Sequence, residues 1–195
     1  MRLSVPACAF AVSLLTSCAA APHATPGTIT PGAAIPIANG VQLVLPAAQP
    51  FGPGLQVVQL VRARSKTRDQ TLQAIIESDA SQLTIIITLP SGPRLASIIW
   101  RPGDIETTLA SNVADKGLSP HLLADLMTIY APAPILAASL RGGTCTESTG
   151  GTRVISTGGV TVITLFRQHP GTWQGAASLT NLSYGYHLDI SGQPL

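Results

Sequence analysis

The chain has 195 residues, enough for one ordinary domain together with a targeting segment and a tether. Charged residues make up 10% of it and hydrophobic residues 45%, which predicts much apolar surface to bury or to present to a ligand. The formal net charge is only +2, so we expect no nucleic-acid partner. The one basic cluster lies where a predicted strand ends in a turn, and we interpret it as a solvated hairpin tip, with an anion site as the alternative. The cluster consists of Arg62, Arg64, Lys66 and Arg68.

The N-terminal segment predicts export. Arg2 precedes an apolar stretch from Leu3 to Leu15, which is shorter than the roughly 20 apolar residues of a spanning helix and typical of a signal-peptide core. The sequence Leu-Thr-Ser-Cys at residues 15–18 resembles a bacterial lipobox, in which small side chains admit the backbone to the signal peptidase and the cysteine thiolate takes the diacylglyceryl group. We therefore predict a lipoprotein signal peptide at residues 1–17 and lipidation of Cys18.

The residues after the cysteine predict a location and a tether. Ala19, rather than Asp, follows Cys18, and by the sorting rule of enteric lipoproteins this implies an outer-membrane anchor facing the periplasm. The alternative is an ordinary secretory signal cut near Ala21. Residues 18–40 are rich in Ala, Pro, Thr and Gly and carry no charged side chain, so we expect a flexible tether that spans about 25 Å. Residues 41–195 then form a single domain.

The pattern of this domain predicts strands, then two helices, then strands. Five strands with short connections indicate an antiparallel meander at residues 55–64, 70–78, 83–89, 94–100 and 104–109. Ser119-Pro120 is typical of a helix start, and apolar residues recur at helical spacing as far as Tyr130. Pro132 ends this helix, and a second short one is expected from about Pro134 to Leu140. Four more strands are expected at residues 152–157, 160–167, 174–182 and 184–190.

The meander is predicted to be apolar on both faces. One face carries the alternating rows that include Leu72, Ile76 and Ile85. The opposite face is expected to carry Ile75, Ile86, Ile98 and Trp100. This second face either packs within the domain, which we favour, or meets a partner.

The order of elements resembles a known family. It combines the hairpin turn Pro90-Ser91-Gly92, the turn Pro102-Gly103, a helical pair around Pro132 and Pro134, and closing segments at residues 179–182 and 184–188. Over residues 41 to 190 this is similar to the outer-membrane receptor of the Lol pathway (LolB) and, more closely, to uncharacterised lipoproteins associated with aryl-polyene biosynthesis clusters. The resemblance implies a mainly antiparallel β (α+β) fold of the LolA/LolB kind, a curved unclosed β-barrel capped by two short helices.

The same resemblance implies a hydrophobic cavity between sheet and helices that takes acyl chains. For each candidate lining residue, ordinary core packing is the alternative. The candidates are Leu72, Ile76, Leu83, Ile85, Ile87, Leu123, Leu126, Met127, Tyr130 and Ile135. Candidates for a membrane-contact loop are Leu89, Pro90 and Ser91, where the Lol receptor has a leucine in place of Ser91.

No catalytic or metal-binding pattern is apparent, and we predict no enzyme activity, no metal and no cofactor. The four histidines are scattered, and we interpret His121 and Asp125 as a surface pair on the polar side of the helix rather than a catalytic dyad. Cys145 is interpreted as an inert residue rather than a nucleophile. The expected function is binding of an acyl chain or a lipidic or lipoprotein cargo at the outer membrane, with the membrane, the cargo and other envelope proteins as partners. The alternative is a non-catalytic adaptor that docks partner proteins.

Overall fold

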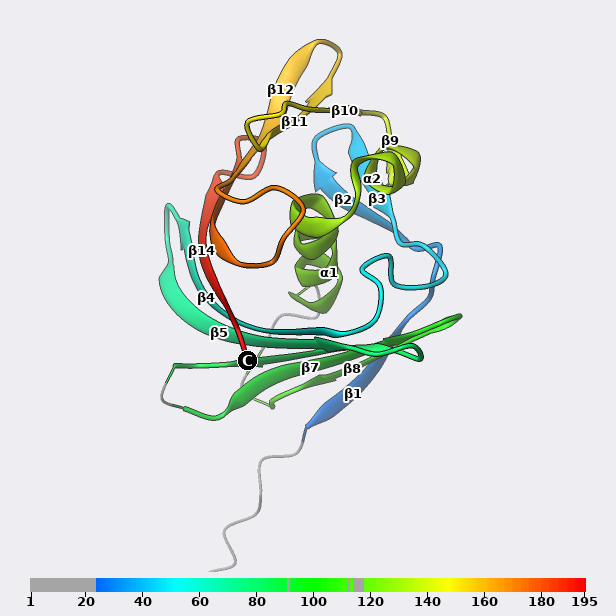
Figure 1. Ribbon diagram of the computed structural model, residues 1–195, viewed down its shortest axis with the longest axis vertical. Helices are drawn as coiled ribbons and strands as arrows, with labels where there is room; N and C mark the ends of the chain where they lie inside the picture. The colour runs from blue at the N-terminus through cyan, green and yellow to red at the C-terminus, as the bar shows by residue number, and fades with distance from the viewer. Residues whose placement is uncertain (1–23, 91, 112, 114–117) are drawn as a thin grey trace, which may run out of the picture.

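The computed structural model describes residues 24–90, 92–111, 113 and 118–195, which form a large curved sheet, a small sheet and two helices (Figure 1). The large sheet contains, in spatial order, β1 (Thr25–Ile29), β8 (Asp104–Leu109), β7 (Arg94–Arg101), β6 (Leu83–Thr88), β5 (Asp69–Ser78), β4 (Leu55–Ser65), β14 (Tyr186–Pro194), β13 (Gly175–Asn181), β12 (Val160–Arg167), β11 (Thr152–Thr157) and β10 (Thr144–Glu147). The small sheet contains β2 (Ala34–Ala38), β3 (Val41–Val44) and β9 (Leu140–Arg141). The helices are α1 (Leu118–Tyr130) and α2 (Ala133–Ser139).

The large sheet is antiparallel throughout and unclosed, because among the described strands β1 and β10 each have one neighbour in it. The predicted class, mainly antiparallel β with a curved unclosed sheet and two short helices, is confirmed. The meander from β4 to β8 follows the predicted order, since each strand pairs with the next. The two halves of the sheet join where β14 pairs with β4, through nine residue pairs from Tyr186 opposite Ser65 to Pro194 opposite Val57.

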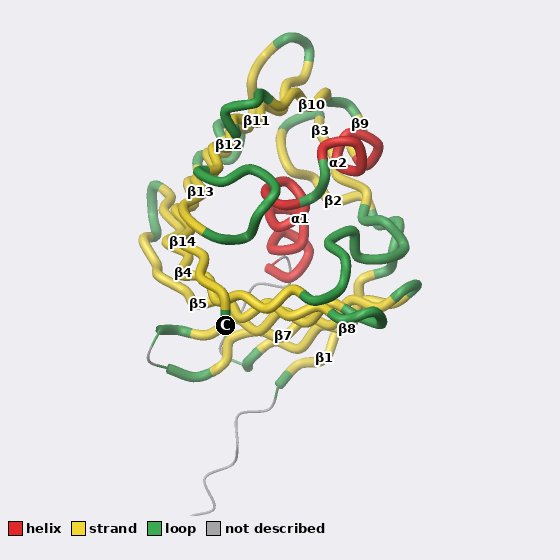
Figure 2. The backbone as a smooth tube through the Cα atoms, viewed as in Figure 1, coloured by secondary structure: helices red, strands yellow, loops and turns green. Residues whose placement is uncertain are grey.

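Helix α1 lies inside the curve of the large sheet, with the small sheet and α2 beyond it (Figures 1 and 2). The apolar side chains of the concave face and of α1 are part of one buried core. Met127 and Leu123 of α1 are fully buried, as are Leu83 and Trp100 of the sheet. None of the described helices is long and apolar enough to cross a bilayer.

The prediction that Ile98 and Trp100 lie on the outer face of the sheet is wrong. Trp100 is paired with Leu83 and Ile98 with Ile85, and directly opposed residues of an antiparallel pair share one face. Both side chains are therefore buried on the concave side. The error arose because the register across the β6–β7 turn cannot be read from either strand alone.

The prediction of a flexible tether through residue 40 is wrong for the segments that form β1 and β2. Strand β1 pairs with β8 along its whole length, and β2 pairs with β3. Ile35 and Ile37 alternate with Ala34 and Pro36, and both isoleucines are 4% exposed. The composition of residues 18–40 taken as a whole did not reveal this short alternation of buried and exposed residues, which is typical of a half-buried strand. The lipobox and Cys18 lie outside the described residues.

A buried charged cluster fixes the C-terminal end of α1 to the second half of the sheet. Arg153 is 1% exposed and donates to the backbone oxygens of Thr128 at 2.6 Å and Ala131 at 2.9 Å. Glu147 pairs with Arg153 at 2.7 Å and also with Arg167. The guanidinium group thus satisfies carbonyl groups that a helix end leaves unpaired.

Candidate functional site

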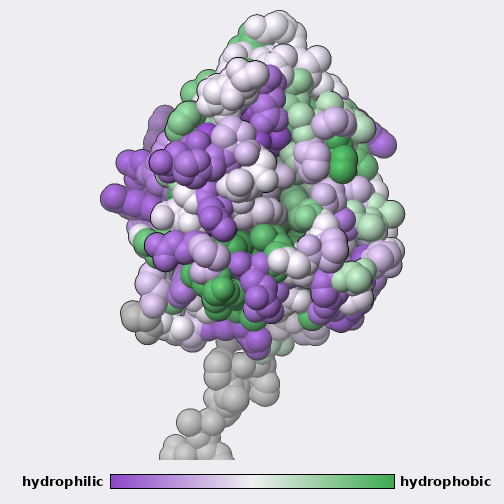
Figure 3. All heavy atoms as spheres, in the orientation of Figure 1, coloured by the Kyte–Doolittle hydropathy of each residue, from purple (hydrophilic) through white to green (hydrophobic). Residues whose placement is uncertain are grey.

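An apolar cavity of about 690 Å³ lies between α1 and the concave face of the large sheet. Side chains from β4, β5, β6 and β14 form one wall, and side chains from α1 form the other. In the view of Figure 3, apolar atoms gather among polar ones over the region between helix and sheet. The lining residues are Pro36, Gln59, Val61, Ala63, Arg64, Ser65, Arg68, Gln70, Leu72, Ala74, Ile76, Ile85, Ile87, Leu118, His121, Leu122, Asp125, Leu126, Ile129, Tyr130, Tyr184, Tyr186, Leu188 and Ile190.

The exposed members of this lining mark where the cavity opens. Arg64 and Arg68 lie at the β4–β5 turn, and His121 lies in the first turns of α1; all three are exposed to solvent. Arg64 is also paired with Asp189 on β14. Arg64 and Arg68 therefore place cationic side chains at the mouth of the cavity, above an apolar interior.

Aromatic side chains lie at the opposite end. The hydroxyl group of Tyr130 accepts a hydrogen bond of 2.8 Å from Gln59, whose side chain is buried. The Tyr130 ring stacks on Trp173 with ring centres 4.0 Å apart, and Phe51 meets Trp173 edge-on at 5.1 Å. Burial raises the pKa of Tyr130 to about 12, so its hydroxyl group is neutral at physiological pH.

A carboxyl group lies between these two ends. Asp125 projects from α1 into the cavity, and its carboxyl oxygen accepts a 2.6 Å hydrogen bond from the hydroxyl group of Tyr186 on β14. Burial in apolar surroundings raises the pKa of Asp125 to about 7, although the hydrogen bond from Tyr186 opposes this rise. Burial and the neighbouring carboxyl group raise the pKa of Tyr186 as well. Asp125 therefore belongs to the cavity, and its interpretation as a surface residue paired with His121 is wrong.

Residues 56–194 match the model of a family described as a protein of unknown function (DUF3261), and this match covers more than half of the chain. The chain belongs to the DUF3261 family. No curated protein matches it. The matched region begins in β4 and contains every lining residue of the cavity except Pro36. Both walls of the cavity are therefore formed by the DUF3261 region.

Six of the ten lining candidates lie on the cavity of the DUF3261 protein, namely Leu72, Ile76, Ile85, Ile87, Leu126 and Tyr130. The structure places the other four elsewhere. Leu83, Leu123 and Met127 are fully buried core residues, and Ile135 is 36% exposed on α2. Met127 is two residues beyond Asp125, about half a turn around the helix, so it faces away from the cavity.

Sequence reasoning missed the lining residues of β4 and β14, and the polar members from both walls. Tyr186, Leu188 and Ile190 alternate along one strand, which is a readable signal for a buried face. Nothing in the alternation indicates that this strand pairs with β4 and so shares a wall with Val61 and Ala63. For Asp125, the apolar residues that surround it on α1 are the only signal.

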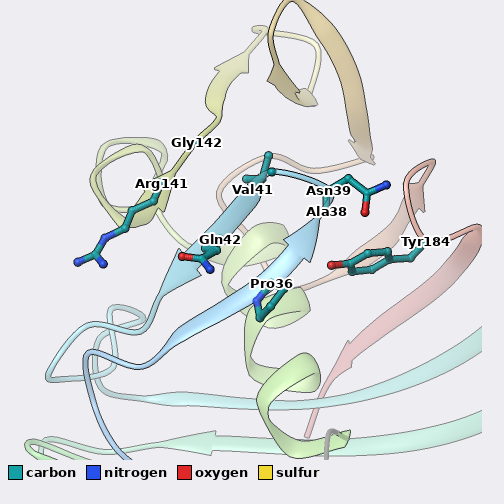
Figure 4. Close-up of a pocket in the computed structure, with 9 residues that line it drawn as sticks. Pro36, Ala38, Asn39, Val41, Gln42, Arg141, Gly142 and Tyr184 are labelled. Atoms are coloured by element: carbon teal, nitrogen blue, oxygen red, sulfur yellow. The ribbon is translucent and has the colours of Figure 1, made fainter.

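A second pocket of about 400 Å³ lies beside the small sheet (Figure 4). Pro36 and Tyr184 line both pockets, and Arg141 and Tyr184 lie at opposite ends of the second one (Figure 4). This separation leaves its polar groups too scattered to converge on one ligand group.

The described residues contain no cluster of three or more His, Cys, Asp or Glu side chains that could hold a metal ion. Cys145 lies in β10 opposite Ile155, and burial raises the pKa of its thiol. A raised pKa disfavours the reactive thiolate form.

Proposed function

We propose that the DUF3261 protein is a lipid-anchored envelope protein that binds an acyl chain, or a lipidic or lipoprotein cargo, in the cavity between α1 and the sheet. The cavity itself carries the proposal. Its volume of about 690 Å³ lies within the range of roughly 300–1,000 Å³ typical of small-molecule sites. Its lining is mainly aliphatic and aromatic, which suits hydrocarbon better than a polar metabolite.

The energetics of chain burial agree with this proposal. Each methylene group moved from water into an apolar site contributes about 0.8 kcal/mol, so ten of them contribute about 8 kcal/mol. A micromolar complex needs about 8.2 kcal/mol, and ordering the chain offsets part of the gain. A long acyl chain is thus sufficient for binding without any strong polar contact.

The curved sheet around a helix supports kinship with the LolA/LolB fold, and with it a place at the outer membrane. Strand β1 is connected to β6 through β8 and β7, and this pairing places Thr25, at the start of β1, level with the C-terminal end of β6. Cys18 is seven residues before Thr25, so a lipid attached there would hold these strand ends near the bilayer. In the β6–β7 turn, which follows the end of β6, Leu89 is half-buried and Pro90 exposed, whereas Ser91 lies outside the described residues. We propose that this turn contacts the membrane.

A cavity-filling substitution tests the proposed function. We expect wild-type protein, exported with residues 1–18 replaced by a conventional secretory signal, to take up a fluorescent fatty acid saturably. Ala63 lines the cavity and is only half-buried, so Ala63→Trp should fill the space and weaken uptake at least about tenfold. The control Ala176→Trp, on exposed β13 surface, should bind like wild type. Lack of saturable uptake by wild type, or equal uptake by both variants, contradicts the proposal.

The adaptor function remains the second candidate because of the outer sheet face. Val58, Ile75 and Ile86 lie side by side across β4, β5 and β6, and all three are partly exposed. If this row docks a partner protein, Ile86→Lys should abolish co-purification of that partner while fatty-acid uptake stays unchanged. Unchanged co-purification contradicts docking through this face.

A further inference from the structure

We propose that Asp125 and Tyr186 bind a hydroxyl group near the head of the hydrocarbon ligand, so that the cavity takes hydroxylated acyl chains in preference to plain ones. This inference rests on the proposed function and names the chemical class of the chain.

Asp125 is the one acidic side chain among the described residues that line the cavity. A polar group in an apolar wall is unfavourable unless it is hydrogen-bonded, and Tyr186 donates the bond at 2.6 Å. A carboxyl group offers about four lone-pair sites, so it can accept further hydrogen bonds in addition to this one. The pair can therefore form a further hydrogen bond with a ligand group in the apolar space. An acyl chain without a polar substituent would leave this capacity unused.

A hydroxyl group matches this pair better than a carboxylate does. A ligand carboxylate beside Asp125 would be repelled by the ionised side chain. The pKa of Asp125 lies at about 7, so both of its protonation forms are populated near neutral pH. A hydroxyl group both donates and accepts hydrogen bonds, so it can pair with either form.

The cationic mouth indicates where the ligand head lies. Arg64, Arg68 and His121 are the basic side chains of the lining, and all are at the exposed end. Asp125 is one helical turn beyond His121, a rise of about 6 Å along the cavity wall. A carboxylate head at the mouth thus places the first few carbon atoms of the chain beside Asp125. A hydroxyl group on one of these first carbon atoms, such as the third, would lie between the mouth and Asp125.

The test compares two acids of equal chain length, hexadecanoic acid and 3-hydroxyhexadecanoic acid, as displacers of a fluorescent fatty acid at pH 7.5. We expect the hydroxy acid to bind wild type about five- to tenfold more tightly, because this ratio corresponds to the free energy of one hydrogen bond of ordinary strength. Tyr186→Phe and Asp125→Leu should each reduce this ratio toward one and keep or improve binding of hexadecanoic acid. The control Asp104→Asn removes an exposed carboxylate far from the lining and should keep the ratio.

Equal affinities of the two acids for wild type overturn this inference, as does a ratio that both cavity variants leave unchanged. These results leave the proposed function intact, because plain chains still bind. Failure of both acids to displace the probe, together with no saturable uptake of the probe itself, contradicts the proposed function instead. If Asp125→Leu does not fold, the near-isosteric Tyr186→Phe and the wild-type comparison still decide the question.

Discussion

Arg153 combines a permanent positive charge with almost complete burial, at 1% exposure. Its two backbone acceptors lie at the C-terminal end of α1, and its carboxylate partner Glu147 lies on β10. Hydrogen bonds and ion pairing together offset the desolvation of the guanidinium group. The residue joins the helix to β10 and β11, two strands that contribute no residue to the lining of the cavity.

We expect Arg153→Met to lower the free energy of unfolding by about 3–5 kcal/mol, because it leaves the helix carbonyl groups without their donor and Glu147 with Arg167 as its remaining partner. Urea unfolding followed by circular dichroism measures this change. The control Arg62→Ala removes the exposed pair with Asp69 and should barely move the unfolding midpoint. Equal effects of the two substitutions would argue against a structural role for the buried cluster.

The raised pKa of Asp125 predicts a particular pH dependence of stability. Between its ordinary value near 4 and its folded value of about 7, the folded protein holds a proton that the unfolded chain has lost. Asp125 therefore contributes stability at low pH that is lost as the pH rises to about 7. The stability of wild type relative to Asp125→Asn should decrease from pH 4.5 to pH 7.5, measured by urea unfolding. A difference that is flat or increases with pH would show that the carboxyl group is not buried as described.

At the scale of elements, β1 and β2 extend the fold beyond the predicted domain boundary. If β2 is a structural strand, Ile35→Ala should lower the free energy of unfolding by about 2–5 kcal/mol, since this side chain is 4% exposed. Val160 is 64% exposed, so Val160→Ala serves as a control with little expected effect. An Ile35→Ala variant as stable as wild type would restore the interpretation of this segment as a tether.

Elements with strong local patterns were predictable. The predicted bounds of β11 and β12 agree with the structure, and α1 begins one residue before the predicted Ser119-Pro120 start. Proline and glycine mark these ends, and alternation or helical spacing fills the interior. The short strands β3, β9 and β10 carry too few residues for a period to show, so they were missed.

The site was predictable only in part, because a cavity depends on long-range pairing. The apolar residues of β5 and β6 were recognised, since each strand alternates clearly. Whether an apolar residue of α1 lines the cavity or packs in the core depends on which side of the helix faces the sheet. The orientation of the helix is set by tertiary packing and cannot be read from the helix sequence alone. Asp125 was misassigned because a polar residue on an amphipathic helix is ordinarily at the surface.

At the scale of the molecule, an unclosed sheet curves around a single helix that only partly fills it. The space left between them has an apolar interior, a cationic mouth and aromatic side chains at its other end. A protein gains little stability from keeping such a space dry and empty, whereas a hydrocarbon chain would complete the packing around it. This is the physical basis for the proposed binding function.

The predicted membrane anchor depends on Cys18 and not on the cavity. We expect Cys18→Ser to abolish metabolic labelling with a radioactive fatty acid and to shift the protein out of the membrane fraction. The substitution of Cys145 by serine is the control, and it should change neither result. Labelling that persists in Cys18→Ser would contradict the predicted site of lipidation.

Native mass spectrometry shows whether the cavity holds a ligand, when the protein is freed of its anchor and purified without added lipid from the periplasm of the cells that produce it. We predict a population heavier than the bare chain by the mass of one acyl-bearing molecule, absent from Ala63→Trp and present in Ala176→Trp. Wild-type protein that carries no such molecule, and that takes up none when long-chain fatty acid is supplied, would contradict the binding of acyl chains in this cavity.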